Sequence, residues 1–496
     1  MFSNNKSAQV SSKSSIVPSD HQQDYSDGDT IRFDVPSFMG FIDPRQSYLK
    51  MDVQINSEEG RMTLNRKCGV QSVINNLRIY DGANRTQLEN IENYAELTSK
   101  THHYSRNESI THKRELTEAL ESGELQNAYF FDTYEPTATI TTATGNNNKV
   151  QVAMPLNSGV LGGDKIFPVV LTQGLKVEID LNDAKKCVQI IPSGTTGHDI
   201  LNHTATAAGT AVCDIAGTVD KCPFVVGQHL ELVNDNVAAK TVIDLGLLVS
   251  IAHNAGNTTL TWTTNTGVVI PKGKAKIRIE AENVAAYKPT LTFSNIELVL
   301  KQVSPPAGYV ADLVRQSQSE AGVNMDIYTY NLYRKNVASS ETISQQNIPS
   351  FNTRALSVLS LPINNTSANV GRDSLETLID GMTSYNYYLN GQSQPSKKVD
   401  VSNLARGFYD QVALWENQKS LMSCGVAVRN LLDLPSNFMI SRALGRYGGV
   451  YNLRDGGDLE LRCEYASTAA VNKLFLNYIC VLRRINISAM GVKVIL

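Results

Sequence analysis

The sequence has no long apolar run and no basic excess, and each absence argues against a class of protein. Its 496 residues include 45 lysines and arginines against 48 aspartates and glutamates. Strong nonspecific binding of nucleic acid is therefore not expected, because such binding needs clustered basic residues to neutralise phosphates. No stretch approaches the roughly 18 uncharged apolar residues of a membrane-spanning helix. The polar start, Met1 to Asp20, also lacks the apolar core of a secretory signal, so entry into the secretory pathway is not expected.

Cysteine pairs of the CxxC type are missing as well. The seven cysteines are scattered along the chain, which argues against a zinc site and against a dense disulfide framework. Free cysteine is commonly buried as a small apolar side chain, and we favour that interpretation here. Cys213 and Cys222 are close enough in sequence to bridge a hairpin, but spacing alone does not establish the Cα separation that a disulfide needs.

Catalytic and phosphate-binding motifs are also lacking. The last of the eight histidines is His253, so a histidine-dependent triad would have to be assembled from the first half of the chain. The glycine-rich stretch 159–165 lacks the GK[ST] ending of a phosphate-binding loop, and we expect a turn before a strand there. Asp24, Asp27 and Asp29 lack the distal glutamate of a calcium loop, and turns before strands are favoured again.

Two further groups of residues, three histidines and two glycosylation sequons, are interpreted as having no functional role. His102, His103 and His112 flank a polar helix start, where a solvated face is favoured over a metal site. The glycosylation sequons at Asn84 and Asn486 are interpreted as chance matches, because no secretory signal precedes them. We therefore assign no catalytic, cofactor-binding or metal-binding residue, and we expect no cofactor and no enzymatic activity.

Alternation of apolar and polar residues predicts β-strands over much of the chain. It is clearest in segments 31–35, 49–55, 175–181, 275–279 and 459–465. This period of two is typical of antiparallel sheets with one side facing solvent. In segment 291–300 the apolar phase slips between Phe293 and Ile296, which predicts a β-bulge.

Helical periods are few. A short apolar stripe spans 88–95, and a capping box at 105–108 predicts a helix that runs toward residue 120. In the second half we expect helices over 375–382 and 404–421. A long series of strands with brief helices between them is typical of β-sandwiches, whereas a parallel α/β sheet would need regular alternation of strand and helix.

Composition divides the chain into four segments. Residues 1–29 are polar and cannot bury enough surface to offset the cost of ordering, so we expect a flexible N-terminal arm. A first sandwich is expected at 30–304, with an outward-facing β-rich insertion at about 195–270. The strand pattern stops at two successive prolines, which predicts a linker at 305–322 and a second sandwich at 323–496.

Three passages resemble the major capsid proteins of Polinton-like viruses and virophages, relatives of the adenovirus-hexon lineage of double-stranded DNA viruses. They are IRFDVPSFMGFIDPRQSYLKMDV from Ile31, LRIYDG from Leu77 followed by LENIENYAEL from Leu88, and GVLGGDKIFPVVLTQGLKVEIDLND from Gly159. The resemblance covers most of the chain and is less distinctive in the final third.

The resemblance implies an all-β tandem double jelly roll, which consists of two eight-stranded antiparallel β-sandwiches with short helices in the loops. It implies a structural role as a major capsid protein, with three copies forming a pseudo-hexagonal capsomer of an icosahedral virion that is assembled inside the host cell. The implied partners are further copies of the chain, neighbouring capsomers, and penton and minor capsid proteins. We expect the N-terminal arm to bind neighbouring capsomers, minor capsid proteins or an internal membrane, and we expect no sequence-specific binding of nucleic acid.

Two alternatives remain open at this point. A β-sandwich adhesin or receptor-binding surface protein would have similar tandem sandwiches and a similar insertion, although an exported adhesin should carry a signal or an anchor. A sandwich-fold glycoside hydrolase would need two carboxylates facing one cleft. The scattered acidic residues of the sequence supply no recognisable pair.

Overall fold

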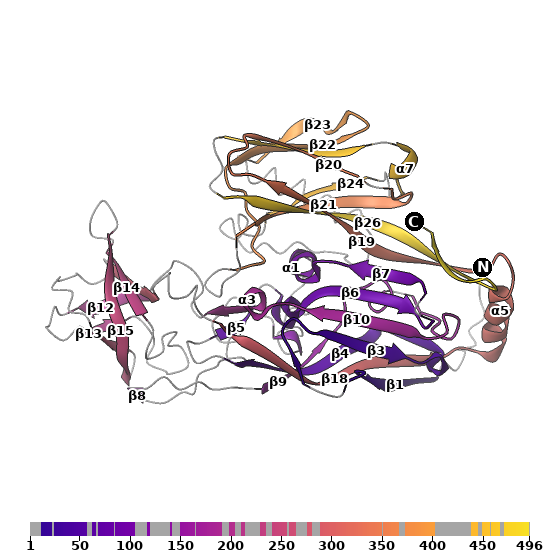
Figure 1. Ribbon diagram of the computed structural model, residues 1–496, viewed down its shortest axis with the longest axis horizontal. Coiled ribbons are helices and arrows are strands. Elements are labelled where there is room, and N and C mark those ends of the chain that lie inside the picture. The colour runs from indigo at the N-terminus through magenta and orange to yellow at the C-terminus, as the bar shows by residue number, and fades with distance from the viewer. Residues whose placement is uncertain are drawn as a thin grey trace, which may run out of the picture.

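The computed structural model consists of two β-sandwiches, one lying on the other, and a smaller β-domain at one end (Figure 1). It describes residues 11–21, 24–56, 62–65, 68–83, 85–104, 117–119, 139–140, 149–163, 165–190, 198–203, 210–213, 229–234, 241–254, 257–263, 275–279, 288–349, 351–366, 373–401, 438–444, 449–456, 458–466 and 471–495. Strands dominate these residues, and helices are short and few. The predicted all-β class is confirmed.

The first sandwich contains a five-stranded and a four-stranded sheet. The order of the larger sheet is β1 (Ser11–Pro18), β18 (Thr290–Ser304), β4 (Phe41–Asn56) and β9 (Lys149–Met154), and β2 (Tyr25–Ser26) also pairs with β18. The order of the smaller sheet is β3 (Thr30–Val35), β10 (Leu175–Leu181), β6 (Ile74–Asp81) and β7 (Gln87–Ile91). The connections contain the paired strands β5 (Met62–Leu64) and β11 (Val188–Ile190), the short helices η1 (Ser37–Met39) and η2 (Gly69–Val73), and the helices α1 (Tyr94–Tyr104) and α3 (Ala184–Cys187).

The second sandwich also contains a five-stranded and a four-stranded sheet. The order of the larger sheet is β19 (Val323–Val337), β26 (Lys473–Ser488), β21 (Ala355–Asn364) and β24 (Ile440–Ala443), and β27 (Gly491–Ile495) pairs with β26. The order of the smaller sheet is β20 (Ile343–Ile348), β25 (Leu459–Tyr465), β22 (Met382–Leu389) and β23 (Gln392–Asp400). A short helix, α7 (Leu453–Gly456), precedes β25.

The two sandwiches have the same strand order. The eight main strands of the first are β1, β3, β4, β6, β7, β9, β10 and β18, and those of the second are β19 to β26. When each set is numbered along the chain, one sheet has the order 1-8-3-6 and its partner sheet the order 2-7-4-5, in both sandwiches. Antiparallel strands wrapped into two facing sheets in this way form a jelly roll. The predicted tandem of two eight-stranded jelly rolls is confirmed.

Alternating side chains build the core of each jelly roll. In β10 the apolar side chains of Leu175, Val177 and Ile179 are almost completely buried, and the charged side chains between them are partly exposed. Burying that apolar face stabilises the sandwich in proportion to the area removed from water. The predicted bulge is confirmed: the pairing of β18 with β4 shifts register between Ser294 and Glu297.

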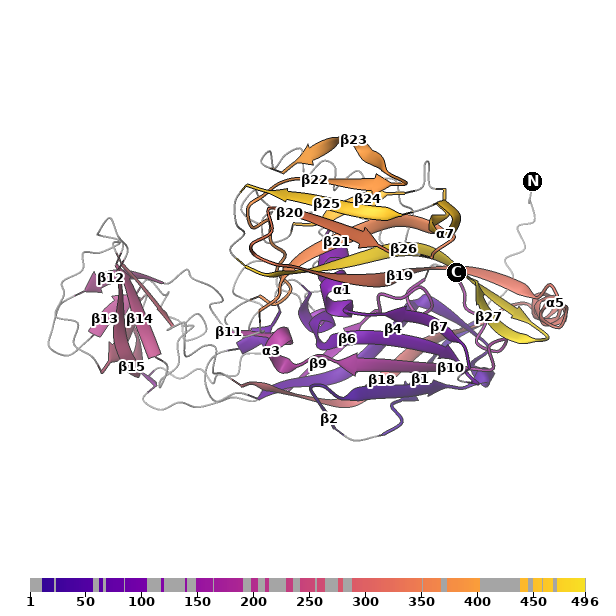
Figure 2. The same cartoon turned by 45° about the horizontal axis from the view of Figure 1, so that its top comes forward.

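The predicted β-rich insertion is a small closed barrel. It consists of β12 (His198–His203), β13 (Thr210–Cys213), β14 (His229–Asn234), β15 (Thr241–Asn254), β16 (Asn257–Trp262) and β17 (Ala275–Ile279). The strands pair in the order β14-β17-β12-β13-β16-β15, and β15 pairs back with β14, so the sheet closes on itself. Strand β8 (Thr139–Ile140) also pairs with β15. The barrel lies at the end of the molecule opposite helix α5 (Ala307–Ser317) (Figure 2).

Two of the expected segments differ in the structure. The expectation of a flexible arm over residues 1–29 is wrong for Ser11–Pro18, which forms β1 and pairs with β18 along its whole length. Backbone hydrogen bonds to a strand edge need no apolar side chains, so the polar composition does not exclude a strand. The expected linker contains helix α5, which begins after Pro306, a residue suited to a helix start.

Two expected helices are also wrong. The apolar stripe at 88–95 is divided between two elements: Leu88 and Ile91 lie in strand β7 and are buried, and Ala95 lies in the first turn of helix α1. Segment 375–382 contains turns and then enters β22 at Met382. The expected helix over 404–421 lies outside the described residues, as does the helix expected from 105 to 120 apart from residues 117–119.

Candidate functional site

The glycine-rich stretch 159–165 contributes to the junction between the two jelly rolls. The carboxylate of Glu89 in β7 accepts hydrogen bonds from the Ser158 hydroxyl and from the main-chain nitrogens of Gly159, at 2.8 Å, and Val160, at 3.3 Å. These N–H groups are the ones that a phosphate would need, and Glu89 already binds them. A Cβ atom on Gly159 would lie 2.2 Å from the carbonyl oxygen of Tyr328, so only glycine permits this close approach of the two jelly rolls.

Arg483 in β26 reaches across the same junction. Its guanidinium donates hydrogen bonds of 3.0 Å to the carbonyl oxygen of Leu88 and to the side chain of Asn331. Arg483 is 8% exposed and Glu89 is completely buried. Burial raises the pKa of Glu89 and lowers that of Arg483, while the charge of Glu89 acts to raise the pKa of Arg483. The two groups thus form a buried polar centre between the jelly rolls.

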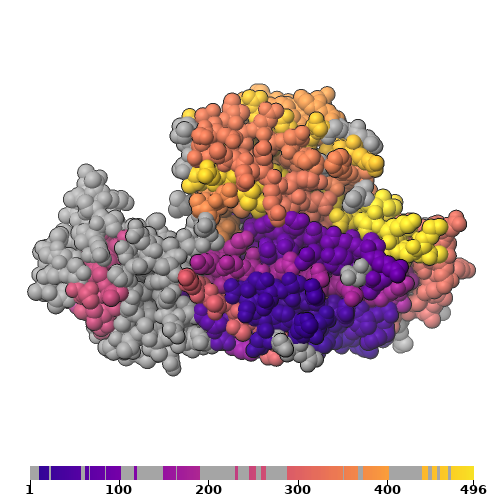
Figure 3. All heavy atoms as spheres, viewed as in Figure 1, coloured from indigo at the N-terminus to yellow at the C-terminus, as the bar shows by residue number. Residues whose placement is uncertain are grey.

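Apolar and polar contacts surround this centre. One continuous apolar cluster contains residues of both jelly rolls, among them Leu88 from the first and Tyr330 from the second. The Tyr478 hydroxyl donates to the carbonyl oxygen of Asn93 at 3.0 Å, and Arg334 forms an ion pair with Glu92 at 2.9 Å. These contacts join the two jelly rolls into one unit, and the two lie directly against each other in the space-filling view (Figure 3).

A carboxylate with two arginines lies near the start of the second jelly roll. Asp326 in β19 accepts hydrogen bonds from Arg484 and from Arg354, each at 2.8 Å. The hydrogen bonds from Arg484 and then from Arg354 hold the pKa of Asp326 well below its usual range. This cluster fixes β19 to β26 and to the chain segment before β21.

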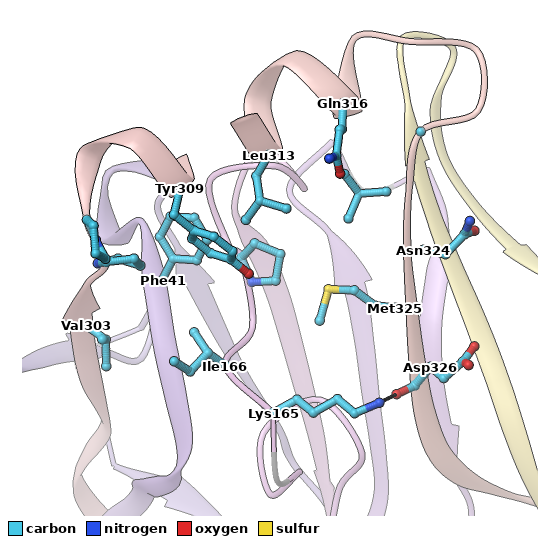
Figure 4. A pocket seen from close by; sticks show the side chains of 15 residues that line it. Phe41, Lys165, Ile166, Val303, Tyr309, Leu313, Gln316, Asn324, Met325 and Asp326 are labelled. Atoms are coloured by element: carbon cyan, nitrogen blue, oxygen red, sulfur yellow. Dashed lines mark hydrogen bonds between the residues drawn. The ribbon is translucent and has the colours of Figure 1, made fainter. Parts of the chain in front are cut away.

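A groove opens between helix α5 and the bodies of both jelly rolls (Figure 4). Its volume is about 1010 Å³. Tyr309 and Leu313 point into it from α5, Ile166 from the first jelly roll and Met325 from the second. On its floor, the Lys165 ammonium donates to the carbonyl oxygen of Asp326 at 3.5 Å. The groove is mainly apolar, although it is open to solvent.

Two of the three carboxylates considered in the sequence as a metal site, Asp27 and Asp29, have structural roles. Asp29 accepts a hydrogen bond from the Ser26 nitrogen at 2.7 Å, which closes the turn before β3. Asp27 accepts from the nitrogens of Ala184 and Leu291 and so joins three chain segments. In the described part of the chain, no group of three His, Cys, Asp or Glu residues is arranged to hold a metal ion.

The structure describes only some of the histidines, glycosylation sequons and cysteines that the sequence analysis considered. The side chains of His102 and His103, and the whole of His112, Asn84 and Cys222, lie outside the described residues. The Asn486 side chain donates to the carbonyl oxygen of Ala321 at 2.9 Å. The described ranges contain no helix long and apolar enough to cross a bilayer.

The structure confirms buried thiols at four of the seven cysteines. Cys68, Cys187, Cys463 and Cys480 are buried and form no disulfide. Burial raises the pKa of Cys480 to about 12, so its thiol is uncharged at neutral pH.

The sequence reasoning missed the junction centre. Glu89 and Arg483 are charged residues within strands, and charged side chains are usually exposed to solvent. The available signal was the pair of adjacent arginines, Arg483 and Arg484, in the most apolar region of the final third.

Comparisons with known proteins identify the fold. No protein-family model and no curated protein sequence matches the chain. Among solved structures, the Faustovirus major capsid protein is similar over 98% of this chain and 92% of its own, with a TM-score of 0.58 and 10% identity. The PBCV-1 virus capsid model is similar over 100% and 99% of the two chains, with a TM-score of 0.51 and 10% identity.

A further structure, PBCV-1 VP54 fitted into a reconstruction of the virophage Sputnik, is similar over 100% of this chain and 99% of its own, with a TM-score of 0.50 and 9% identity. These similarities extend over both jelly rolls and the region between them. The resemblance noted in the sequence is thereby confirmed at the level of fold. The chain has the double jelly-roll fold of the Faustovirus and PBCV-1 capsid proteins.

Proposed function

We propose that this chain is the major capsid protein of a double-stranded DNA virus. The observation that carries the proposal is the repeated strand order, 1-8-3-6 and 2-7-4-5, in two jelly rolls that are joined by a continuous apolar cluster. The similarity to the two capsid structures over almost the whole chain supports it. On this proposal the protein works in the virion as a structural component and catalyses no reaction.

The duplicated fold suits a pseudo-hexagonal trimer. Each copy presents two similar sandwiches side by side, so three copies related by a threefold axis place six similar walls around one centre. Cyclic symmetry closes such a ring without leaving unpaired interfaces. Obligate interfaces of this kind bury on the order of thousands of Å². The partners on this proposal are further copies of the chain, neighbouring capsomers, and penton and minor capsid proteins.

We also propose the orientation of the chain in the shell. The inserted barrel and helix α5 lie at opposite ends of the molecule, and the described C-terminal strand β27 lies at the α5 end (Figure 2). The barrel then faces outward, and the α5 end faces the interior, where it contacts minor capsid proteins or an internal membrane. The near-neutral charge balance supports a shell without sequence-specific binding of the genome.

Mass measurement combined with negative-stain microscopy of the purified protein tests the proposal. A mass of three chains and particles of hexagonal outline are the expected result. A stable monomer would contradict the proposal, and a monomer that binds cell surfaces would instead support the adhesin alternative.

A further inference from the structure

The groove beside α5 exposes apolar side chains that no described residue covers. Tyr309 is 57% exposed and Ile166 is 48% exposed, although both point into the groove. Helix α5 has 11 residues and none of them is buried. An isolated helix of that length is marginal in water, and most helical stability in proteins comes from packing an apolar face. The described chain leaves this packing incomplete.

The direction of β1 indicates what covers the groove. Strand β1 is antiparallel to β18, and Ser11, its first residue, lies opposite Ser304. Strand β18 ends at Ser304, so the chain before Ser11 extends past the end of β18, toward Pro305 and Pro306. Both prolines line the groove. Residues 1–10 lie outside the described part of the chain, and ten residues span at most roughly 33 Å.

The composition of this segment fits an apolar groove. Residues 1–10 read MFSNNKSAQV, so Phe2 and Val10 are separated by a mainly polar stretch. A buried aromatic side chain in a pocket is the usual anchor of a peptide in a groove. Tyr309 and Phe41 line the groove and offer Phe2 an aromatic surface.

We propose that the groove between α5 and the two jelly rolls is a docking site for residues 1–10 of the same chain, with Phe2 as the anchor. The docked segment covers Tyr309 and Leu313 and clamps the linker helix against the body of the molecule. Docking within one chain does not depend on capsomer assembly, so this inference can fail while the proposed function stands, and the reverse also holds.

Cysteine cross-linking in the full-length protein tests the inference. The variant with both Phe2→Cys and Leu313→Cys is expected to form a disulfide within one chain on mild oxidation, identified by mass spectrometry of the linked peptides. The matched control pairs Phe2→Cys with Ile343→Cys, an exposed position on β20 of the second jelly roll, and no link is expected. Absence of the Phe2–Leu313 link would overturn the proposal.

A second cross-linking experiment shows whether the docked segment belongs to the same chain or to another copy. When chains carrying only Phe2→Cys are co-expressed with chains carrying only Leu313→Cys, no cross-linked dimer is expected. Links that form only between chains would show that a second copy occupies the groove, and the proposal would be wrong.

Amide exchange supplies an independent readout in the protein without added cysteines. The Phe2→Ala variant is expected to increase exchange in Ala307–Ser317 by about tenfold, because the helix loses its cover. The Ser3→Ala variant is the control and should leave exchange unchanged. Equal exchange in both variants would contradict the proposal.

Discussion

Arg483 of the second jelly roll donates a hydrogen bond to the main-chain carbonyl of Leu88 in the first, at 3.0 Å and across 395 positions of sequence. The next residue in β7, Glu89, is completely buried and holds the 158–160 turn through three hydrogen bonds. Two adjacent residues of β7 therefore make different contacts. The Leu88 carbonyl binds the second jelly roll, and the Glu89 carboxylate binds the glycine-rich turn of the first. The stability of the junction should depend strongly on these few polar groups.

Arg483→Met should destabilise the protein by about 3 kcal/mol. The variant leaves the Leu88 carbonyl and the Asn331 side chain without their charged donor and leaves Glu89 buried without a neighbouring cation. Urea unfolding measures the change. Arg315→Met, on the exposed side of α5, is the control and should change stability by less than about 0.5 kcal/mol. Equal unfolding midpoints for the two variants would show that Arg483 is not important at the junction.

Gly159→Ala should cost about 2–4 kcal/mol, because the added Cβ would lie 2.2 Å from the Tyr328 carbonyl oxygen and would force the jelly rolls apart. Gly308→Ala is the matched control. A Cβ at Gly308 meets nothing within 4 Å, and alanine favours the helix, so this variant should be neutral or more stable by up to about 1 kcal/mol. Thermal unfolding of both variants measures the difference, and a neutral Gly159→Ala would contradict the packing described here.

Glu89→Gln should change how stability depends on pH. The folded pKa of Glu89 is raised by burial above its unfolded value of about 4.3. Its contribution is therefore fully present below that value and is lost as the pH rises through the folded pKa. Relative to the Gln variant, the wild-type free energy of unfolding should fall as the pH rises from about 4 toward neutrality. A difference that is constant with pH would show that Glu89 does not titrate differently on folding.

Asp326→Asn should have the opposite pH dependence. Two arginines hold the folded pKa of Asp326 below its unfolded value of about 3.9, so its contribution is present above that value and is lost as the pH falls through the folded pKa. At pH 7 the variant should be less stable by about 1 kcal/mol, a modest effect because the ion pairs are partly exposed and screened. Urea unfolding at several pH values should show this difference shrinking below about pH 4.

Asp34→Asn is the control for Asp326→Asn, because Asp34 is an exposed aspartate with a single ion-pair partner among the described residues. Asp34 forms a 3.5 Å ion pair with Lys176, and its side chain is 61% exposed. Its replacement should change stability by less than about 0.5 kcal/mol at any of these pH values. A similar loss in both variants would argue that the second arginine at Asp326 adds nothing.

Replacement of residues 191–287 by a short flexible linker should preserve both jelly rolls. Ile190 lies opposite Met62, and Thr290 lies opposite Asn56, so the two ends are held near positions only six residues apart in the chain. Circular dichroism and mass measurement should show a folded trimer, and microscopy should show the loss of one projection per copy. Failure to fold would show that the barrel is part of the first jelly roll's core.

Much of the fold could be predicted from periodicity. The alternation in β10 and β25 corresponds closely to the observed burial, and the phase slip in β18 marks the bulge at Ser294. These predictions succeed because one face of each strand packs on a core within the same sandwich. Strand β1 could not be predicted in this way, because five of its first six side chains are exposed or nearly so and its order comes from main-chain pairing.

The junction could not be predicted from local patterns. Arg483 lies on the same face of β26 as the buried Ile485 and Ile487. A charged residue is rarely buried without a partner, and the Arg483 partner, the Leu88 carbonyl, belongs to the other jelly roll, where local patterns do not reveal it. The helical spacing at 375–382 was misleading for a related reason. Leu375 packs with Cys68 of the first jelly roll, so the apolar spacing reflects a contact between domains and not one face of a helix.

The closed inserted barrel limits what the projecting end of the molecule can do. Each of its six strands is hydrogen-bonded to a neighbour on both sides, and β8 pairs with the part of β15 that extends beyond β14. An open sheet at that position would offer an unpaired edge to every copy crowded beside it, and unpaired edges recruit further strands. A ring has no such edge. Copies of the molecule can therefore lie close together without pairing edge to edge through the strands of this appendage.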